Sequence, residues 1–286
     1  MDAVWSIGVY TGDTLFDLKP AVNVENPVIT AGAVGDIDAE FVADPFMIRV
    51  GRTWHMFFEV MNAQTNRGEI GLAISDDGFV WRYARIVLSR PFHLSYPYVF
   101  CLDNEYYMVP ESHRADSTSL YRADPFPEKW SLVGSIMKGA WVDSSIVFFG
   151  GMWWMFATPA LSRSSRLDLF YSESISGPWR AHPMNAIVAD NNRIARPGGR
   201  VIVLGDKLIR FTQDCHPFYG TQVRAFEISE LTESSYRERE VGSTPILSGG
   251  GSDWNRFGMH HVDPHWADGR WLACVDGWRC EMPSHN

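Results

Sequence analysis

The chain has 286 residues, a length at which all-β proteins still form one unit, and we expect residues 1–286 to be a single domain. The formal net charge is −9 and Lys and Arg form no cluster, which excludes the basic surface that nucleic acid or an anionic membrane requires. Residues 1–20 contain no basic segment followed by an apolar run, so we expect a cytoplasmic protein without membrane insertion.

Cysteine and aromatic content narrow the partners further. Four cysteines, Cys101, Cys215, Cys274 and Cys280, lack the close paired spacing of a zinc or redox motif, so we expect reduced thiols and no metal or other cofactor. Small molecules or glycans remain as ligands, bound by a monomer or a weak homodimer. Aromatic residues make up 14% of the chain; their flat faces pack against sugar C–H groups, but they also fill β-sheet cores.

A strand-turn-strand unit repeats along the chain. The segment AVWSIGVYTG from Ala3 predicts a strand without a hairpin partner. Five units follow: ADPFMIRVGRTWHMFFEV from Ala43, SYPYVFCLDNEYYMVPES from Ser95, VDSSIVFFGGMWWMFATP from Val142, ARPGGRVIVLGDKLIRFTQDC from Ala195 and VDPHWADGRWLACVDG from Val262. Their turns are rich in Gly, Asn and Asp, which tolerate positive φ, so each unit predicts an antiparallel hairpin.

The first three hairpins continue into a second, weaker repeat. It comprises GEIGLAISDDGFVW, TSLYRADPFPEKW and LDLFYSESISGPW, whose final residues Trp81, Trp130 and Trp179 each open another strand. Four strands per unit at a period of about 50 residues is typical of a propeller blade. We therefore predict an all-β, five-bladed β-propeller with scarce helix, in which the amino-terminal strand completes the last blade. A β-sandwich is the alternative, but it predicts irregular spacing and no shared first residue.

The repeat also places candidate functional residues. The innermost strands of a propeller run in one direction, so their first polar residues meet in an inner ring: Asp44, Tyr96, Asp143, Arg196 and Asp263. The returning strands end at the same rim, which gives an outer ring: Glu59, Glu111, Thr158, Gln213 with Asp214, and Asp276. Carboxylates gathered in this way need a cation or raised pKa values. Asp-Pro pairs and Asp276-Gly277 are also ordinary turn sequences.

Cationic and histidine side chains lie beside these carboxylates. Arg196 and Arg200 in ARPGGR could neutralise them or bind an anionic ligand. A histidine can protonate a leaving group or bind a sugar hydroxyl, and metal binding by His260, His261 and Asp263 is the alternative. We assign substrate binding to Glu59, Tyr96, Arg196, Arg200, Gln213, Asp214, His260, His261 and Asp263.

Ordered motifs across essentially the whole chain resemble a known family. ADPFMI, GEIGLAISDDG, FHLSYPYVF, YYMVPES, ARPGGR, RFTQDC and GMHHVDPH are similar to the amino-terminal domain of glucosamine inositolphosphorylceramide transferases. That domain resembles the five-bladed propellers of furanoside-cleaving glycoside hydrolases, which implies a general base, a pKa-tuning partner and a general acid. Asp44 in ADPFMI matches the base motif. Tyr96 stands where many such hydrolases have Asp, and Asp143 is followed by Ser144 rather than Pro.

The leading interpretation is a hydrolase-like enzyme that acts without metal on a glycosidic or related acetal bond. Inverting hydrolysis needs two carboxyl groups roughly 6.5–9.5 Å apart, one of them protonated. The resemblance makes Asp44 the base, and we assign Glu111 as the acid and Asp143 as the modulator. The alternatives are a non-catalytic carbohydrate-binding propeller and a tailoring enzyme of small-molecule biosynthesis. The glycosyltransferase domain of the family is not in this sequence, so ceramide glycosylation is not expected.

Overall fold

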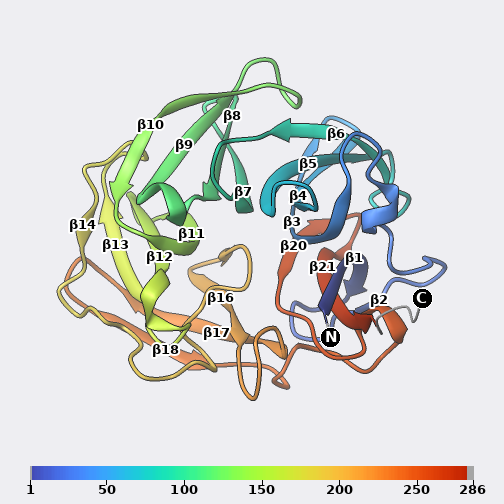
Figure 1. Ribbon diagram of the computed structural model, residues 1–286. Helices are drawn as coiled ribbons and strands as arrows, with labels where there is room; N and C mark the ends of the chain where they lie inside the picture. Colours follow the sequence, from blue (N-terminus) through green and yellow to red (C-terminus); the bar gives the residue numbers. More distant parts are fainter. Residues whose placement is uncertain (1, 282–286) are drawn as a thin grey trace.

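A computed structural model describes residues 2–281 and confirms the five-bladed β-propeller (Figure 1). Five antiparallel sheets surround a central axis, and each begins with its innermost strand. Helix in the described residues is limited to four short 3₁₀ turns, at Ala31–Ala33, His113–Ala115, Ala160–Ser162 and Asp253–Asn255. No helix in this part of the chain is long and apolar enough to cross a bilayer.

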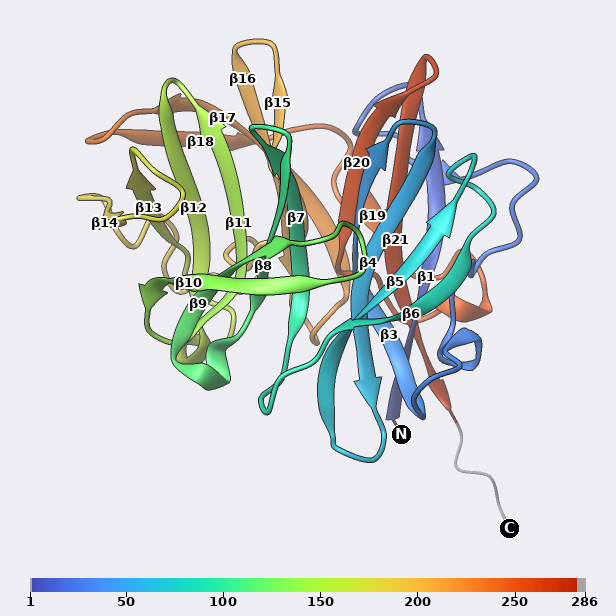
Figure 2. The same cartoon turned by 90° about the horizontal axis from the view of Figure 1, so that it is seen from above.

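The blades follow one another in sequence order. The first contains β3 (Ala39–Val50), β4 (Thr53–Asn62), β5 (Arg67–Ser75) and β6 (Arg82–Leu88). The second contains β7 (Ser95–Leu102), β8 (Glu105–Glu111), β9 (Ser117–Ala123) and β10 (Trp130–Lys138). The third contains β11 (Trp141–Phe149), β12 (Met152–Pro159), β13 (Asp168–Ser172) and β14 (Arg180–Ala181). The turns of the inner hairpins gather on one side of the molecule, the upper side in Figure 2.

Two sequence predictions are confirmed in these blades: the tryptophans that open the outer strands and the tight turns of the inner hairpins. Trp130 begins β10, whereas Trp81 and Trp179 directly precede β6 and β14, and each indole N–H donates to a nearby backbone carbonyl. Asp103 and Asn104 in the β7–β8 turn have φ of 51° and 62°, and Gly150 and Gly151 in the β11–β12 turn have 61° and 82°. Positive φ at both central residues is what a tight hairpin between twisted strands requires.

The fourth blade departs from the predicted start at Ala195. It contains β15 (Ile202–Leu204), β16 (Lys207–Asp214), β17 (Gln222–Leu231) and β18 (Tyr236–Glu240), and a fifth short strand, β19 (Leu247–Ser248), pairs with β17. The ARPGGR segment before β15 makes only an isolated bridge to β16, from Pro197 to Thr212. Gly199 explains this, because its backbone lies so close to the fifth blade that an added Cβ would be 1.8 Å from the Val262 carbonyl oxygen.

The amino-terminal strand closes the ring, as predicted. The fifth blade contains β20 (Val262–Ala267), β21 (Arg270–Glu281), β1 (Asp2–Gly12) and β2 (Lys19–Pro20). β1 pairs with β21 along its whole length, from Asp2 opposite Glu281 to Gly12 opposite Trp271. Ile7 and Val9 of β1 are fully buried in a cluster that also contains Met47 and Phe58 of the first blade. The first and last segments of the chain therefore share one sheet and one core.

If β1 belongs to the cooperative core, Ile7→Ala will lower the free energy of unfolding by about 2–5 kcal/mol, because it leaves a cavity between the first and last blades. Urea unfolding followed by intrinsic fluorescence measures the change. Val22→Ala is the matched control, since Val22 is 82% exposed, and it should change stability by less than about 0.5 kcal/mol. Equal stabilities of the two variants would contradict closure by a buried β1.

Candidate active site

Three inner strands carry the same irregularity at the residue that the repeat aligns. Asp44, Tyr96 and Asp143 all adopt the left-handed conformation, with φ of 53°, 45° and 51°. The pairing of each inner strand with its neighbour shifts register at that point. Such a β-bulge removes one residue from the hydrogen-bonded ladder and turns its side chain and its N–H to new directions. The positions that the repeat aligns are thus also conformationally equivalent.

The N–H groups freed by the bulges are bound by carboxylates of the adjoining strands. Asp44 N–H donates to Asp276 Oδ2 (3.0 Å), and Tyr96 N–H donates to Asp44 Oδ2 (3.2 Å). Asp143 N–H donates to Glu111 Oε2 (3.2 Å). These bonds run from blade to blade around the axis and draw four carboxyl groups to one rim.

The ends of the second strands lie at this rim as well. Glu59 pairs with Ala43, Glu111 with Ser95, and Thr158 with Val142. In the fourth blade, where the regular strand is missing, Gln213 N–H still donates to the Arg196 carbonyl oxygen (2.9 Å). The two predicted rings are therefore neighbours in space in blades one to four.

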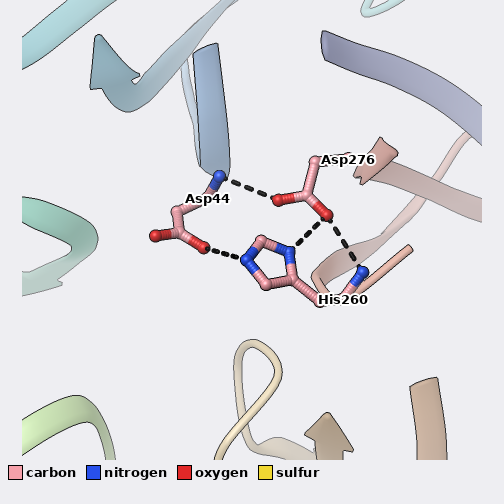
Figure 3. A group of neighbouring side chains, drawn as sticks. All are labelled: Asp44, His260 and Asp276. Atoms are coloured by element: carbon pink, nitrogen blue, oxygen red, sulfur yellow. Dashed lines mark hydrogen bonds and ion pairs between the residues drawn. The ribbon is translucent and has the colours of Figure 1, made fainter. Parts of the chain in front are cut away.

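Asp44, His260 and Asp276 form a chain of buried polar side chains (Figure 3). His260 Nδ1 lies 2.8 Å from Asp276 Oδ1, and its Nε2 lies 3.6 Å from Asp44 Oδ1. Burial alone would lower the pKa of His260, but Asp276 and Asp44 hold it above its usual value. Burial also favours neutral Asp276, but the positive charge and hydrogen bond of His260 outweigh it, so the pKa of Asp276 lies below its usual range.

Asp44 responds in the opposite way. Burial, together with the negative charges of Asp143 and Asp276, raises the pKa of the Asp44 carboxyl to about 8, although His260 works against the shift. Asp44 therefore holds a proton at neutral pH. This differs from the expectation for a general base, which should be ionised in the free protein.

A second group is centred on Asp143. Arg196 Nε donates to Asp143 Oδ2 (2.5 Å), and Gln213 Nε2 donates to the same oxygen (2.6 Å). Burial favours neutral Asp143, but the Arg196 guanidinium outweighs it and the pKa of Asp143 falls below its usual value. Burial raises the pKa of the adjoining Glu111 to about 6, against a hydrogen bond from His113 (2.6 Å) and the charge of Arg196.

Glu59 completes the buried carboxyl cluster. Burial and the charges of Asp44 and Glu111 raise the pKa of Glu59 well above its usual value. Its Oε1 lies 3.3 Å from His93 Nε2, and His93 Nδ1 accepts a hydrogen bond from Gly68 N–H (2.8 Å). Burial lowers the pKa of His93 to about 4, so His93 does not supply a positive charge to Glu59 at pH 7.

Several residues assigned to substrate binding are engaged by other parts of the protein instead of facing the rim. The Tyr96 side chain is fully buried, and its hydroxyl accepts a hydrogen bond from Gly199 N–H (2.7 Å) and lies 2.8 Å from Ser145 Oγ. Asp263 pairs with Arg200 (2.6 Å) and accepts Met47 N–H (2.6 Å). β20 has no bulge, so Asp263 is not turned toward the rim as Asp44 is.

Asp214 lies apart from the carboxyl cluster, whereas the His261 backbone N–H donates to Asp276 Oδ1 (3.0 Å) although the His261 ring makes no hydrogen bond. Asp214 binds Arg224 and Gln222 at the far side of β16 (2.9 and 2.8 Å). His261 packs edge-on against Phe46 and Tyr96, and burial lowers its pKa to about 4. Among the described residues, the grouping that could hold a metal ion is Asp44, His260 and Asp276, not the predicted His260, His261 and Asp263.

Sequence reasoning missed three contributors to the rim, and it left Asp276 of the outer ring open as an ordinary turn residue. His93 and His113 each stand two residues outside a strand end that carries a site residue, a spacing that could have identified them. Tyr219, in the loop after β16, places its ring 5.0 Å from the Arg196 guanidinium carbon and 5.1 Å from the His260 ring. Asp276-Gly277 lies inside β21 rather than in a turn, because Gly277 allows Asn255 to approach within 2.4 Å of where a Cβ would be.

Comparison with known proteins places this rim in context. The family model described as Glucosamine inositolphosphorylceramide transferase 1, N-terminal, matches residues 1–278. The curated relatives include Glucosamine inositolphosphorylceramide transferase 1 of Oryza sativa subsp. japonica and of Arabidopsis thaliana, both 37% identical over 295 residues and 96% of this chain. The chain spans 40% and 39% of the length of these two relatives.

Solved structures that superpose on this chain include glycoside hydrolases. A glycosyl hydrolase from Bacteroides ovatus superposes with a TM-score of 0.68 at 12% identity and covers 96% of this chain and 95% of its own. A thermostable family-43 glycoside hydrolase superposes with a TM-score of 0.59 at 14% identity and covers 81% of this chain and 84% of its own. At these identities the likeness shows the propeller fold alone.

The ion pair between Arg196 and Asp143 leads to a prediction about the stability of the protein. Arg196→Met should cost about 3–5 kcal/mol at pH 7, because it leaves the Asp143 carboxylate buried without its cation. The depressed pKa of Asp143 stabilises the native protein above the unfolded value near pH 3.9, so the loss should shrink as the pH falls and Asp143 gains a proton. Urea unfolding at pH values from 7 down to 3 measures this, because that window includes the unfolded pKa near 3.9.

The matched control is the double variant Arg196→Met with Asp143→Asn, which removes both charges and should recover most of the lost stability. If the double variant is no more stable than Arg196→Met at pH 7, Arg196 does not compensate Asp143.

Proposed function

Because the chain belongs to the glucosamine inositolphosphorylceramide transferase 1 N-terminal family, and its rim groups two carboxyl pairs beside cations, we propose that it is a carbohydrate-active enzyme. The proposed chemistry is metal-independent acid/base catalysis on a glycosidic or related acetal bond. The observation that carries the proposal is the pairing itself: Asp44 with Asp276 and His260, and Glu111 with Asp143 and Arg196.

Each pair combines one carboxyl group that keeps its charge with one that exchanges a proton near neutral pH. Environments that push the pKa values of neighbouring carboxyl groups apart are the usual basis for separate acid and base roles. Asp44 and Glu111 are also linked in space, because Asp44 binds the N–H of Tyr96 and Glu111 lies opposite the preceding Ser95. The two proton-exchanging groups therefore flank one short segment of β7.

The electrostatics favour a definite order of roles. Asp44, with a pKa of about 8, is the proton donor to the leaving oxygen, and Glu111, with a pKa of about 6, is the base. In hydrolysis Glu111 takes a proton from water as the water oxygen bonds to the anomeric carbon, and the bond to the leaving oxygen breaks as that oxygen receives the Asp44 proton. This order reverses the expected roles, in which the resemblance implies Asp44 as the base and Glu111 is assigned as the acid, and it keeps Asp143 as the modulator.

The proposal predicts a bell-shaped dependence of kcat/KM on pH. Activity should fall as the pH drops through about 6, where Glu111 gains a proton, and as it rises through about 8, where Asp44 loses one. Initial rates on a panel of 4-nitrophenyl arabinofuranosides, xylosides and glucosaminides measure the profile. Glu111→Gln should abolish the acidic limb and Asp44→Asn the alkaline limb.

The same variants separate the two roles. Asp44→Asn should reduce the rate of cleavage of unactivated glycosides by about 10²–10⁴-fold. The rate on dinitrophenyl glycosides should fall far less, because their leaving group needs no proton. Glu111→Gln should be rescued by azide, which replaces the activated water as nucleophile. Azide rescue of Asp44→Asn instead would reverse the assignment, and full activity of both variants would rule out this site as the catalytic one.

A carbohydrate-binding propeller without catalysis is the second candidate. Tyr96 favours it, because the inner strand of the second blade directs a buried tyrosine, not a carboxylate, toward Ser145 and Gly199. Saccharide binding by calorimetry without turnover of any glycoside in the panel would select this candidate.

A further inference from the structure

Four aromatic side chains form a partly exposed surface beside the carboxyl rim, which we call the aromatic shelf: Phe218, Tyr219, Phe257 and Trp278. Phe218, Tyr219 and Phe257 are 44%, 43% and 40% exposed. Trp278 lies between two of them, stacked on Phe257 with ring centroids 5.3 Å apart and edge-on to Phe218 at 5.7 Å. Solvent-facing aromatics in contact with one another, unlike scattered apolar residues, indicate a binding surface.

The shelf is held in place by hydrogen bonds between three segments, one from a side chain and one within the backbone. Trp278 Nε1 donates to the Gly220 carbonyl (3.0 Å), and Phe257 N–H donates to the Trp278 carbonyl (3.1 Å). Gly258 approaches Gly220 so closely that an added Cβ would lie 1.9 Å from the Gly220 carbonyl oxygen. The rings are therefore mounted on a fixed support, and a ligand that stacks on them does not have to order a loop.

The shelf is continuous with the rim. Tyr219 contacts both Arg196 and His260, the cations of the two carboxyl pairs. Beneath it, the buried Trp5 of β1 stacks on His260 at 4.1 Å and also contacts Tyr219 and Trp278. A ligand that reaches from Asp44 or Glu111 past Tyr219 thus arrives at the faces of Phe218, Trp278 and Phe257.

We propose that the aromatic shelf is a saccharide subsite that binds a second sugar unit of a glycan whose reacting bond lies at the carboxyl rim. This inference rests on the proposed function and narrows its substrate to oligosaccharides or glycans. A sugar ring presents a C–H face that packs on an aromatic ring and an edge of hydroxyl groups that needs polar neighbours.

The surroundings of the shelf suit a sugar better than a lipid. Arg196 lies at its inner end and Arg256 lies 5.9 Å from the Phe257 ring at its outer end, so both ends offer hydrogen-bond donors. An acyl chain would offer the Arg256 guanidinium no hydrogen-bond acceptor, and the net charge of −9 opposes approach to an anionic membrane.

Calorimetric titration of the Asp44→Asn protein tests the subsite without turnover. The probes are arabino-, xylo- and chito-oligosaccharides of one to five units. In one of these series, oligosaccharides of two or three units should bind about tenfold more tightly than the single sugar. This gain corresponds to the contribution of a good aromatic contact. Phe257→Ala and Phe218→Ala, added singly, should remove this gain and leave the affinity for the single unit within about twofold.

Phe148→Ala is the matched control, because Phe148 is another exposed phenylalanine, on β11 in the third blade, and it should keep the gain. Equal melting temperatures exclude misfolding of the variants. A gain that depends on Phe257 in a protein that turns over no glycoside would support the subsite and reject the proposed enzyme.

Turnover of single-unit glycosides without any gain from chain length would reject the subsite and retain the enzyme. No chain-length gain in any series, or an equal gain in Phe257→Ala, overturns the subsite. Binding of dodecyl phosphocholine micelles that depends on Phe257, without saccharide binding, overturns it in favour of a lipid.

Discussion

The site depends on the hydrogen bond between a bulged backbone N–H and a carboxylate from an adjoining strand. The bulges at Asp44, Tyr96 and Asp143 release N–H groups from the ladder in a buried region, where an unpaired donor costs about 1–3 kcal/mol. Carboxylates are strong acceptors and satisfy these donors. The same bonds that preserve the inner strands therefore concentrate acidic groups at the rim, at one end of the central axis.

This concentration leaves a charge problem that the protein solves only in part. Five buried carboxyl groups share the rim, Asp44, Glu59, Glu111, Asp143 and Asp276, and two cations lie among them, Arg196 and His260. Each cation lowers the pKa of the carboxyl group it contacts most closely, Asp143 and Asp276. The others are buried without full compensation and hold protons more tightly. Groups able to exchange protons near neutral pH are the physical result.

The arginines also illustrate this balance. Arg196 and Arg200 were considered as sites for an anionic ligand, yet Arg196 engages Asp143 and Arg200 engages Asp263. Each guanidinium is committed to a buried carboxylate, which is the other role that the sequence suggested. A substrate meeting this rim encounters a surface that is close to balanced in charge, in keeping with a neutral sugar.

The repeat was sufficient to predict the blades, the closing strand and the rings, because strand direction and period follow from alternation and turn chemistry. It could not predict which side chains face the rim. Asp44 and Asp263 both precede proline at aligned positions of an inner strand, but only Asp44 lies at a bulge. The role of Asp276 was hidden because the Asp-Gly pair serves a close approach by Asn255 within β21 and not a turn. The bulge at Asp44 and the place of Asp276 within β21 both depend on contacts with segments that are distant in the sequence.

Closure of the ring and assembly of the site are one event in this fold. β1 contributes Ile7 opposite Asp276 and Trp5 opposite Trp278, so its pairing with β21 fixes a carboxylate of the rim and a ring of the shelf together. Trp5 then stacks on His260, whose positive charge and hydrogen bond keep Asp276 ionised, and the Asp276 charge in turn helps to raise the pKa of Asp44. An open ring would lack this stack and the β1–β21 pairing. The strand that removes the free edge of the last blade thereby also sets the protonation of the rim.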